Sequence, residues 1–195
     1  IESFGLWAEQ LVAESTGKIG RGILPVVVPS PAAPNYSPSS ADEFLVVTGS
    51  DEPPTAMSGY SAAVTGPLGA QFLLWETAVA IAGRELGINP FDQPDVESAK
   101  QAARTFLTAD GGSAEQPVFS DNGIAAFGTS ASTLAAAVEE LLGHVDPDHG
   151  YIAIQAYLDR FGHPAYAELR ELLAARTGRP VTFGWGPRFL HSTGQ

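Results

Sequence analysis

Apolar residues recur at helical spacing in several stretches of the chain. In the first stretch Phe4, Trp7 and Leu11 share one face. Gly17 is a suitable C-terminal stop, so we predict a helix over residues 2–15. The same reasoning predicts further helices over residues 67–86, from a cap within 92–95 to about Leu107, and over residues 132–143 and 164–177.

Short apolar runs between these helices predict strands. Residues 44–47 (FLVV) form a continuous apolar run, which is the pattern of a strand covered on both faces. Residues 23–28 are strand-like, although Pro25 interrupts them. The other predicted strands are residues 124–127, 151–158 and 181–190, and loops are expected over residues 29–40 and 51–60. Alternating strands and helices predict an α/β fold with a mostly parallel sheet and helices on both faces.

The expected buried positions follow from the same pattern. We expect the helix over residues 67–86, which ends at Gly87, to be a core helix. Its polar residues exclude a membrane span, which needs about 18 or more uncharged apolar residues. In the helix over residues 132–143, the side chains expected to point inward are Leu134, Val138, Leu141 and Leu142.

Composition narrows the class of protein. The 195 residues are enough for one domain with a real core. Lys and Arg total ten in a chain of net charge -12, which argues against an extended nucleic-acid surface. The absence of cysteine excludes disulfides and thiolate chemistry and suits a cytoplasmic protein. Because the chain opens inside an amphipathic pattern with no leader, we expect it to be a piece of a longer polypeptide.

Lys100 interrupts an apolar helical stripe. Val96 and Ala103 lie about one turn before and after it, where packing would favour another apolar residue. Only one other lysine, Lys18, occurs in the chain. One interpretation is a side chain that runs along the helix edge with its amine in water. The other is a buried ammonium, which would need an anionic partner or substrate.

Glu14 lies in the last turn of the first predicted helix. A carboxylate there faces the negative end of the helix macrodipole, a setting suited to a general base. The alternative is a solvated glutamate at a helix end. The following residues do not form a phosphate-binding loop, because such a loop needs a glycine five residues before Gly17, where Val12 stands.

The histidines do not have the spacing of a metal site, and no metal is expected. His191 lies just past an apolar run that is predicted as a strand. Parallel sheets bind ligands at the carboxyl ends of their strands, so His191 is a candidate site residue. The alternative is a polar residue that simply ends a strand.

Three segments of the chain resemble phosphoglucose isomerase. They are residues 14–18 (ESTGK), 87–97 (GINPFDQPDVE) and 186–195 (GPRFLHSTGQ). More specifically, they resemble the isomerase half of actinobacterial bifunctional transaldolase/phosphoglucose isomerase proteins. The similarity spans nearly the whole chain, and the NPFDQP run with Lys100 after it is the most specific part.

The resemblance implies a fold and a reaction. The fold is a three-layer sandwich of sugar-isomerase (SIS) type with a five-stranded, mostly parallel sheet, and residues 1–195 would be the second of two such subdomains. The reaction is the interconversion of glucose 6-phosphate and fructose 6-phosphate through a cis-enediol, without a cofactor. The implied partners are the sugar phosphate, a preceding isomerase subdomain, a transaldolase domain and a second copy in a homodimer, with neither nucleic acid nor membrane.

The resemblance also implies roles for individual residues. Glu14 would move the proton between the first and second carbons, and Lys100 would assist at the ring oxygen. Ser15, Thr16 and Gly17 would end the helix so that Glu14 faces the substrate, and are expected at the substrate-binding site. Lys18 is expected to be structural or to anchor the turn.

Two features depart from the family pattern. The ring-opening histidine usually lies between the base and the lysine, yet residues 18–99 contain no histidine. His191, a residue beyond Gln195 or another subunit would have to fill that role. The family's phosphate clamp lies largely in the first subdomain, so Glu14 and Lys100 would form half a site and the isolated chain would be inactive.

Two other functions fit the same residues. A sugar-phosphate sensor of the same fold would bind the ligand without turnover, and it would need no proton shuttle. Another aldose-ketose isomerase, such as one acting on mannose 6-phosphate, would share the enediol chemistry. The presence of both Glu14 and Lys100 favours an enzyme over a sensor.

Overall fold

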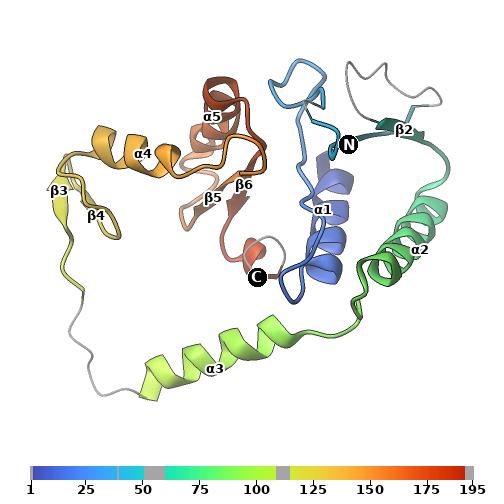
Figure 1. The fold of residues 1–195 in the computed structure, drawn as a ribbon, viewed down its shortest axis with the longest axis horizontal. Coiled ribbons are helices and arrows are strands. Elements are labelled where there is room, and N and C mark those ends of the chain that lie inside the picture. Colours follow the sequence, from blue (N-terminus) through green and yellow to red (C-terminus); the bar gives the residue numbers. More distant parts are fainter. Residues whose placement is uncertain (1, 39, 51–59, 109–114, 192–195) are drawn as a thin grey trace.

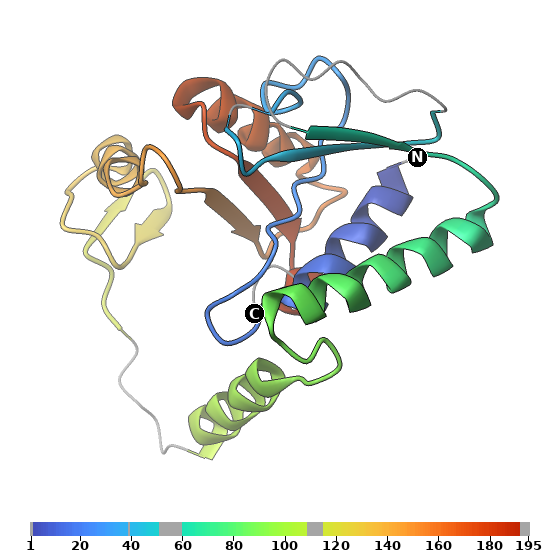
Figure 2. The same ribbon diagram turned by 45° about the vertical axis from the view of Figure 1, so that its right-hand side comes forward.

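The computed structural model describes residues 2–38, 40–50, 60–108 and 115–191 (Figures 1 and 2). Helices and strands alternate irregularly along these residues. In chain order the elements are α1 (Glu2–Thr16), β1 (Phe44–Thr48), β2 (Tyr60–Val64), α2 (Leu68–Leu86), α3 (Pro94–Thr108), β3 (Phe119–Asp121), β4 (Ile124–Ala126), α4 (Leu134–Gly143), β5 (Ile152–Ala156), the 3-10 helix η1 (Pro164–Glu168), α5 (Leu169–Thr177), β6 (Val181–Trp185) and the 3-10 helix η2 (Arg188–His191).

The strands pair two by two. β1 runs parallel to β2, with Val46 opposite Ala62, and β5 runs parallel to β6, with Ile154 opposite Phe183. β3 and β4 form an antiparallel hairpin. The mixed α/β character predicted from the sequence is therefore present. The described residues form three two-stranded sheets and no five-stranded sheet.

The first packed region lies around α1. Aromatic side chains of α1 and α2 meet, and the rings of Trp7 and Phe72 are 4.4 Å apart in an edge-to-face arrangement. η2 packs on α1 from another direction, and Phe189 is almost fully buried, with 1% of its surface exposed. The C-terminal part of the described chain is thus held against the first helix (Figures 1 and 2).

The second packed region lies between α5 and the β5–β6 pair. Val181 is completely buried there, and Ile152 and Ala174 pack with it. Burial of such side chains contributes about 1.5–3 kcal/mol each. The partly buried side chains around this cluster are Leu142, Val145, Ile154 and Leu173.

Most predicted helix ends are confirmed, because the residues that end the helices are visible in the sequence. Gly87 and Gly178 follow α2 and α5 with φ values of 70° and 65°, the left-handed conformation that glycine adopts without steric cost. Thr133 caps α4 by accepting a hydrogen bond from the N–H of Ala136 at 3.2 Å.

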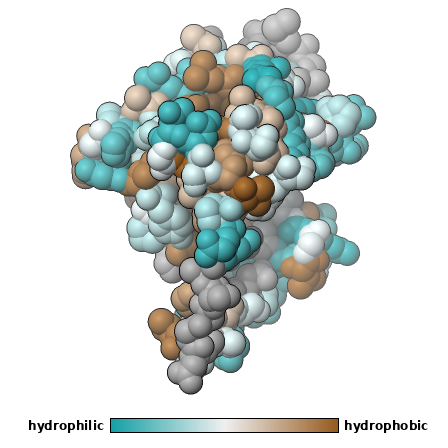
Figure 3. Space-filling model, turned by 90° about the vertical axis from the view of Figure 1, so that its left-hand side faces the viewer, coloured by the Kyte–Doolittle hydropathy of each residue, from teal (hydrophilic) through white to brown (hydrophobic). Residues whose placement is uncertain are grey.

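The predicted burial of α2 and α4 is wrong for much of each helix. Only Val79 and Gly83 of α2 are buried, whereas Leu73 is 66% exposed. Leu141 of α4, expected to point inward, is 62% exposed, and Leu134 and Val138 are also largely at the surface. Figure 3, which views the side that carries β3, β4 and α4, shows apolar residues among the polar ones at the surface.

Two predicted strands differ from the structure for local reasons. Residues 23–28 form no strand, because the N–H of Ile23 bonds the Thr16 hydroxyl and the Val27 carbonyl accepts from Arg170. The last strand ends at Trp185 instead of Leu190. Pro187 has no N–H to donate to a sheet, and the chain turns there into η2.

Two strands were not predicted. β2 begins at Tyr60, which was assigned to a loop, and consists mostly of small residues with weak strand preference. The rest of that loop, residues 51–59, lies outside the described residues. β3 precedes the Asn122-Gly123 pair that turns the chain into β4. Over the described residues, no helix combines the length and apolar character that a membrane span requires.

Candidate functional site

The end of α1 is fixed by hydrogen bonds within the chain. The Thr16 hydroxyl donates to the Val12 carbonyl at 2.7 Å and accepts from the N–H of Ile23 at 3.0 Å, and the residue is completely buried. The N–H of Gly17 donates to the Ala13 carbonyl at 2.9 Å. Thr16 was expected at the substrate-binding site, but its hydroxyl is used to hold the turn.

A tight turn follows at residues 18–21. The N–H of Lys18 donates to the Arg21 carbonyl at 2.9 Å, and the N–H of Arg21 donates back to the Lys18 carbonyl at 3.0 Å. The central residues Ile19 and Gly20 both have positive φ, 49° and 74°. This is the geometry of a type I′ turn, which a β-branched residue such as isoleucine rarely adopts. Contacts with the rest of the chain therefore hold Ile19 in this unfavourable backbone conformation.

The two cations of this turn bind backbone carbonyls. Lys18 is only 5% exposed, and its Nζ donates to the Glu14 carbonyl at 2.9 Å and to the Asp92 carbonyl. Arg21 donates to the Leu86 carbonyl at the end of α2. Cations at these positions also complement the negative ends of the helix dipoles. The prediction that Lys18 anchors the turn is confirmed.

The Glu14 side chain reaches the segment that precedes α3. The residue as a whole is half-buried, and its carboxylate accepts an exposed hydrogen bond from Gln93 Nε2 at 3.1 Å. This contact joins residues 79 positions apart in the sequence. Gln93 was not among the predicted site residues; its place between Asp92 and Pro94, within the NPFDQP run, was the available signal.

Lys100 is not brought to Glu14. Its Nζ pairs with the Glu97 carboxylate at 2.8 Å on the same helix, and its side chain is 55% exposed. α3 extends away from the rest of the molecule in both views (Figures 1 and 2). The interpretation of Lys100 as an exposed lysine on the helix surface therefore describes its position here, and the convergence of its amine with Glu14 is not present.

His191 is the last residue of η2. The preceding strand ends at Trp185, so His191 lies six positions beyond it and not directly at its end. η2 packs on α1, where Arg188 donates to the Leu6 carbonyl and, at 3.1 Å, to the Glu9 carboxylate. The backbone of His191 is therefore in a segment held beside the helix that carries Glu14 (Figures 1 and 2).

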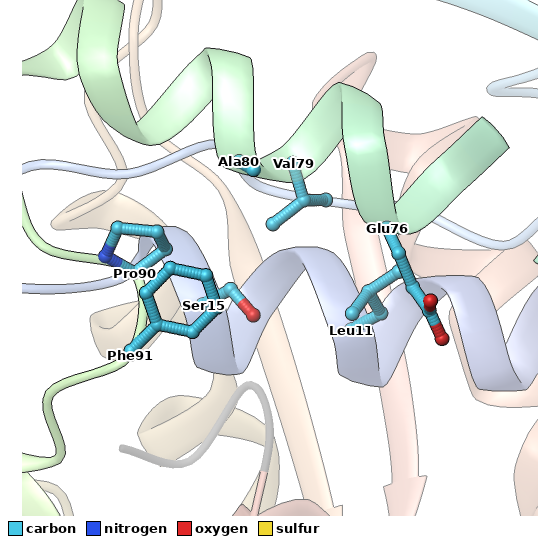
Figure 4. Close-up of a pocket in the computed structure, with 7 residues that line it drawn as sticks. All are labelled: Leu11, Ser15, Glu76, Val79, Ala80, Pro90 and Phe91. Atoms are coloured by element: carbon cyan, nitrogen blue, oxygen red, sulfur yellow. The ribbon is translucent and has the colours of Figure 1, made fainter. Parts of the chain in front are cut away.

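A small hollow of about 180 Å³ lies between α1, α2 and the linker to α3 (Figure 4). Its surface is mainly apolar, and the Ser15 side chain and the Glu76 carboxylate add polar atoms. Ser15 was expected near a substrate, and it does face this hollow. The lining does not include Glu14, which is the preceding residue on α1. The described residues that line the hollow are Leu11, Ser15, Glu76, Val79, Ala80, Pro90 and Phe91.

The Glu9 carboxylate of α1 is buried next to a guanidinium group. Burial raises the pKa of the Glu9 carboxyl, and the Arg188 guanidinium opposes that effect by favouring the ionised form. Glu9 is 6% exposed, and Arg188 covers it from the side of η2. This pair links the C-terminal segment to α1 and lies one to two turns from Glu14.

Within the ranges that the structure describes, no three histidine or acidic side chains are grouped closely enough to hold a metal ion. The chain matches no family model, no curated protein and no solved structure.

Proposed function

We propose that this chain is the second sugar-isomerase subdomain of a phosphoglucose isomerase and interconverts glucose 6-phosphate and fructose 6-phosphate through a cis-enediol. The three segments that carry the resemblance are far apart in sequence, and described residues of each either belong to α1 or contact it. Residues 14–18 end the helix, Asp92 and Gln93 bind that end, and Arg188 binds its middle. Such convergence is what a shared site requires.

The hydrogen bond between Gln93 and Glu14 is the observation that carries the proposal. One oxygen of the Glu14 carboxylate accepts from the amide, which fixes the orientation of the group. The second oxygen remains able to take a proton from a substrate carbon and return it to the neighbouring carbon. Once the sugar ring is open, the enediol step needs such a base and groups that stabilise the developing oxyanion.

Lys100 would act at the ring oxygen after a change in the direction of α3. It lies six residues beyond Pro94, about 9 Å along the helix axis at 1.5 Å per residue. A rotation near the start of α3 would bring the Lys100 ammonium towards Glu14. The substrate would then replace the Glu97 carboxylate as the partner of this ammonium. His191 is the candidate for ring opening on η2.

The finer features of the fold belong to the same proposal. The parallel pairs β1–β2 and β5–β6 would be parts of one five-stranded parallel sheet. The exposed apolar residues of α2 and α4 support this, because apolar patches of that kind are normally covered. The preceding subdomain would supply the phosphate clamp, and a second copy would complete a homodimer in the cytoplasm.

A sensor that binds a sugar phosphate without turnover is the second candidate. The observation that favours it is the ion pair of Lys100 with Glu97, which holds the Lys100 ammonium on α3 and not at Glu14. Both functions require binding of a sugar phosphate, but only the isomerase would convert it.

The test is the conversion of fructose 6-phosphate to glucose 6-phosphate by the polypeptide that includes both isomerase subdomains, with the 195-residue chain and mannose 6-phosphate measured in parallel. We expect turnover of fructose 6-phosphate by the longer polypeptide and little or none by the chain alone. Saturable binding without turnover would favour the sensor. Preferred turnover of mannose 6-phosphate would instead indicate an aldose-ketose isomerase that acts on that sugar phosphate.

A further inference from the structure

The linker between α2 and α3 is held at both ends by a single turn. Arg21 donates to the Leu86 carbonyl, just before the linker begins, and Lys18 donates to the Asp92 carbonyl, just before it ends. Both cations belong to the type I′ turn of residues 18–21. Both ends of the linker that leads to α3 are therefore tied to the turn that follows α1.

The middle of the linker is packed against α2. The N–H of Ile88 donates to the Gly83 carbonyl at 2.9 Å. A Cβ atom at Gly83 would lie 2.9 Å from the Pro90 ring, so only glycine allows this approach. The linker thus follows the surface of α2 before it passes from Asp92 into α3.

Lys18 binds the linker where it passes from Asp92 into α3. Its two acceptors are the carbonyl of Glu14 and the carbonyl of the residue before Gln93. The ammonium therefore bridges the backbones of the same two segments that the Glu14–Gln93 side-chain hydrogen bond joins. Burying an ammonium is unfavourable unless its hydrogen bonds are made, so this lysine has a specific reason to be there.

We propose that Lys18 is a positioning residue for the Glu14 site, with Arg21 as the second anchor of the linker. Lys18 holds Gln93 against the Glu14 carboxylate and fixes the start of α3, the point about which the helix that carries Lys100 would turn. The kinetic consequence rests on the proposed isomerase function, whereas the anchoring itself does not.

The anchoring is tested by the distance between α2 and α3. Because the chain has no cysteine, two spin labels at Glu85→Cys and Gln101→Cys, both exposed positions, report that distance. We expect Lys18→Met, which keeps the chain length and removes the donor, to broaden the distance distribution. Lys18→Arg should restore a narrow distribution. Arg84 is an exposed cation at the end of α2, and Arg84→Met serves as the control that should leave the distribution unchanged. A distribution in Lys18→Met identical to that of the parent overturns the proposal.

Arg21→Met keeps the proposal testable if Lys18→Met fails to fold. Arg21 is at the surface, so its loss should leave the fold intact and release the first end of the linker. We expect a broadened distribution for this variant also. An unchanged distribution would contradict the anchoring of the linker by the turn.

The kinetic test uses the longer polypeptide in which isomerase activity is measured. We expect Lys18→Met to lower kcat by about 10²-fold, the cost of displacing a catalytic group by about 1 Å, with KM little changed and with recovery in Lys18→Arg. Unchanged kcat would overturn the positioning role. If Glu14→Gln were fully active, the proposed function would fail while the spin-label distances still decided the anchoring.

Discussion

The end of α1 and the helix α3 carry the two halves of the same proposed chemistry, but they differ in how they are held. The end of α1 is buried and closed by hydrogen bonds from Thr16, Lys18 and Gly17. Every described side chain of α3 is exposed, apart from the half-buried Val96. The two lysines show the difference most clearly: Lys18 is 5% exposed, and the Lys100 side chain is 55% exposed.

This difference shows how firmly each of the two proposed catalytic side chains is held by the fold. Glu14 lies on a scaffold that fixes its backbone and orients its carboxylate. Lys100 lies on α3, which is joined to that scaffold by hydrogen bonds of Asp92 and Gln93 just before the helix begins. Variants in the two regions should therefore have very different effects on stability, and matched substitutions can measure the contrast.

The largest effect is expected for Phe189→Ala. Phe189 is 1% exposed, and its ring meets that of Tyr157 edge-to-face at 5.0 Å. Removing a buried phenylalanine side chain costs about 3–5 kcal/mol. Urea unfolding of the parent and the variant measures the loss. A loss below about 1 kcal/mol, the typical effect of a point mutation, would mean that Phe189 is not part of a well-packed core in solution.

A smaller loss is expected for Arg188→Met. The change leaves the Glu9 carboxylate buried without its partner, at a cost of about 1–3 kcal/mol. Urea unfolding should also show recovery in the double variant Glu9→Gln, Arg188→Met, because the unpaired charge is then removed. Equal stabilities of the single and double variants would show that the Glu9 charge is not the cause.

Glu9→Gln should change how stability depends on pH. Because burial raises the pKa of Glu9, the folded state holds its proton more tightly than the unfolded state. The resulting stabilisation is present below the ordinary pKa of a glutamate and is lost as the pH rises through the raised value. The parent should therefore lose stability relative to Glu9→Gln as the pH rises above the ordinary pKa of a glutamate. Glu85→Gln, at an exposed position, serves as the control, and a difference independent of pH would contradict the assignment.

The smallest effect is expected for Phe106→Ala on α3. The residue type is the same as in Phe189→Ala, but Phe106 is 81% exposed. Substitutions at such surface positions usually change stability by no more than about 0.5 kcal/mol. A loss comparable to that of Phe189→Ala in urea unfolding would mean that α3 is packed in solution, and the contrast between the two regions would disappear.

The elements that the sequence predicts well are those with local signals. Gly87 and Gly178 end their helices as predicted, and the apolar run at residues 44–47 lies within β1. β2 has no such signal, because its small residues form a strand only by pairing with β1. The Asn122-Gly123 turn before β4 was a local signal for the β3–β4 hairpin that the prediction did not use.

The site was only partly predictable. The position of Glu14 at a helix end follows from the helical pattern and Gly17. The contact with Gln93 depends on where a helix 79 positions later begins, and no local pattern contains that information. Periodicity placed Lys100 on an apolar stripe, but whether that stripe is covered depends on long-range packing, and in the structure it is exposed.

The most direct measurement of the central claim is the exchange of the proton at the second carbon of the substrate with solvent deuterium, in Glu14→Gln of the longer polypeptide. Glu85→Gln, a carboxylate in the last turn of α2, is the matched control. We expect Glu14→Gln to slow exchange by about 10²–10⁴-fold, the usual contribution of a general base, while fructose 6-phosphate still binds. Exchange in Glu14→Gln at the rate of Glu85→Gln would contradict the assignment of Glu14 as the base.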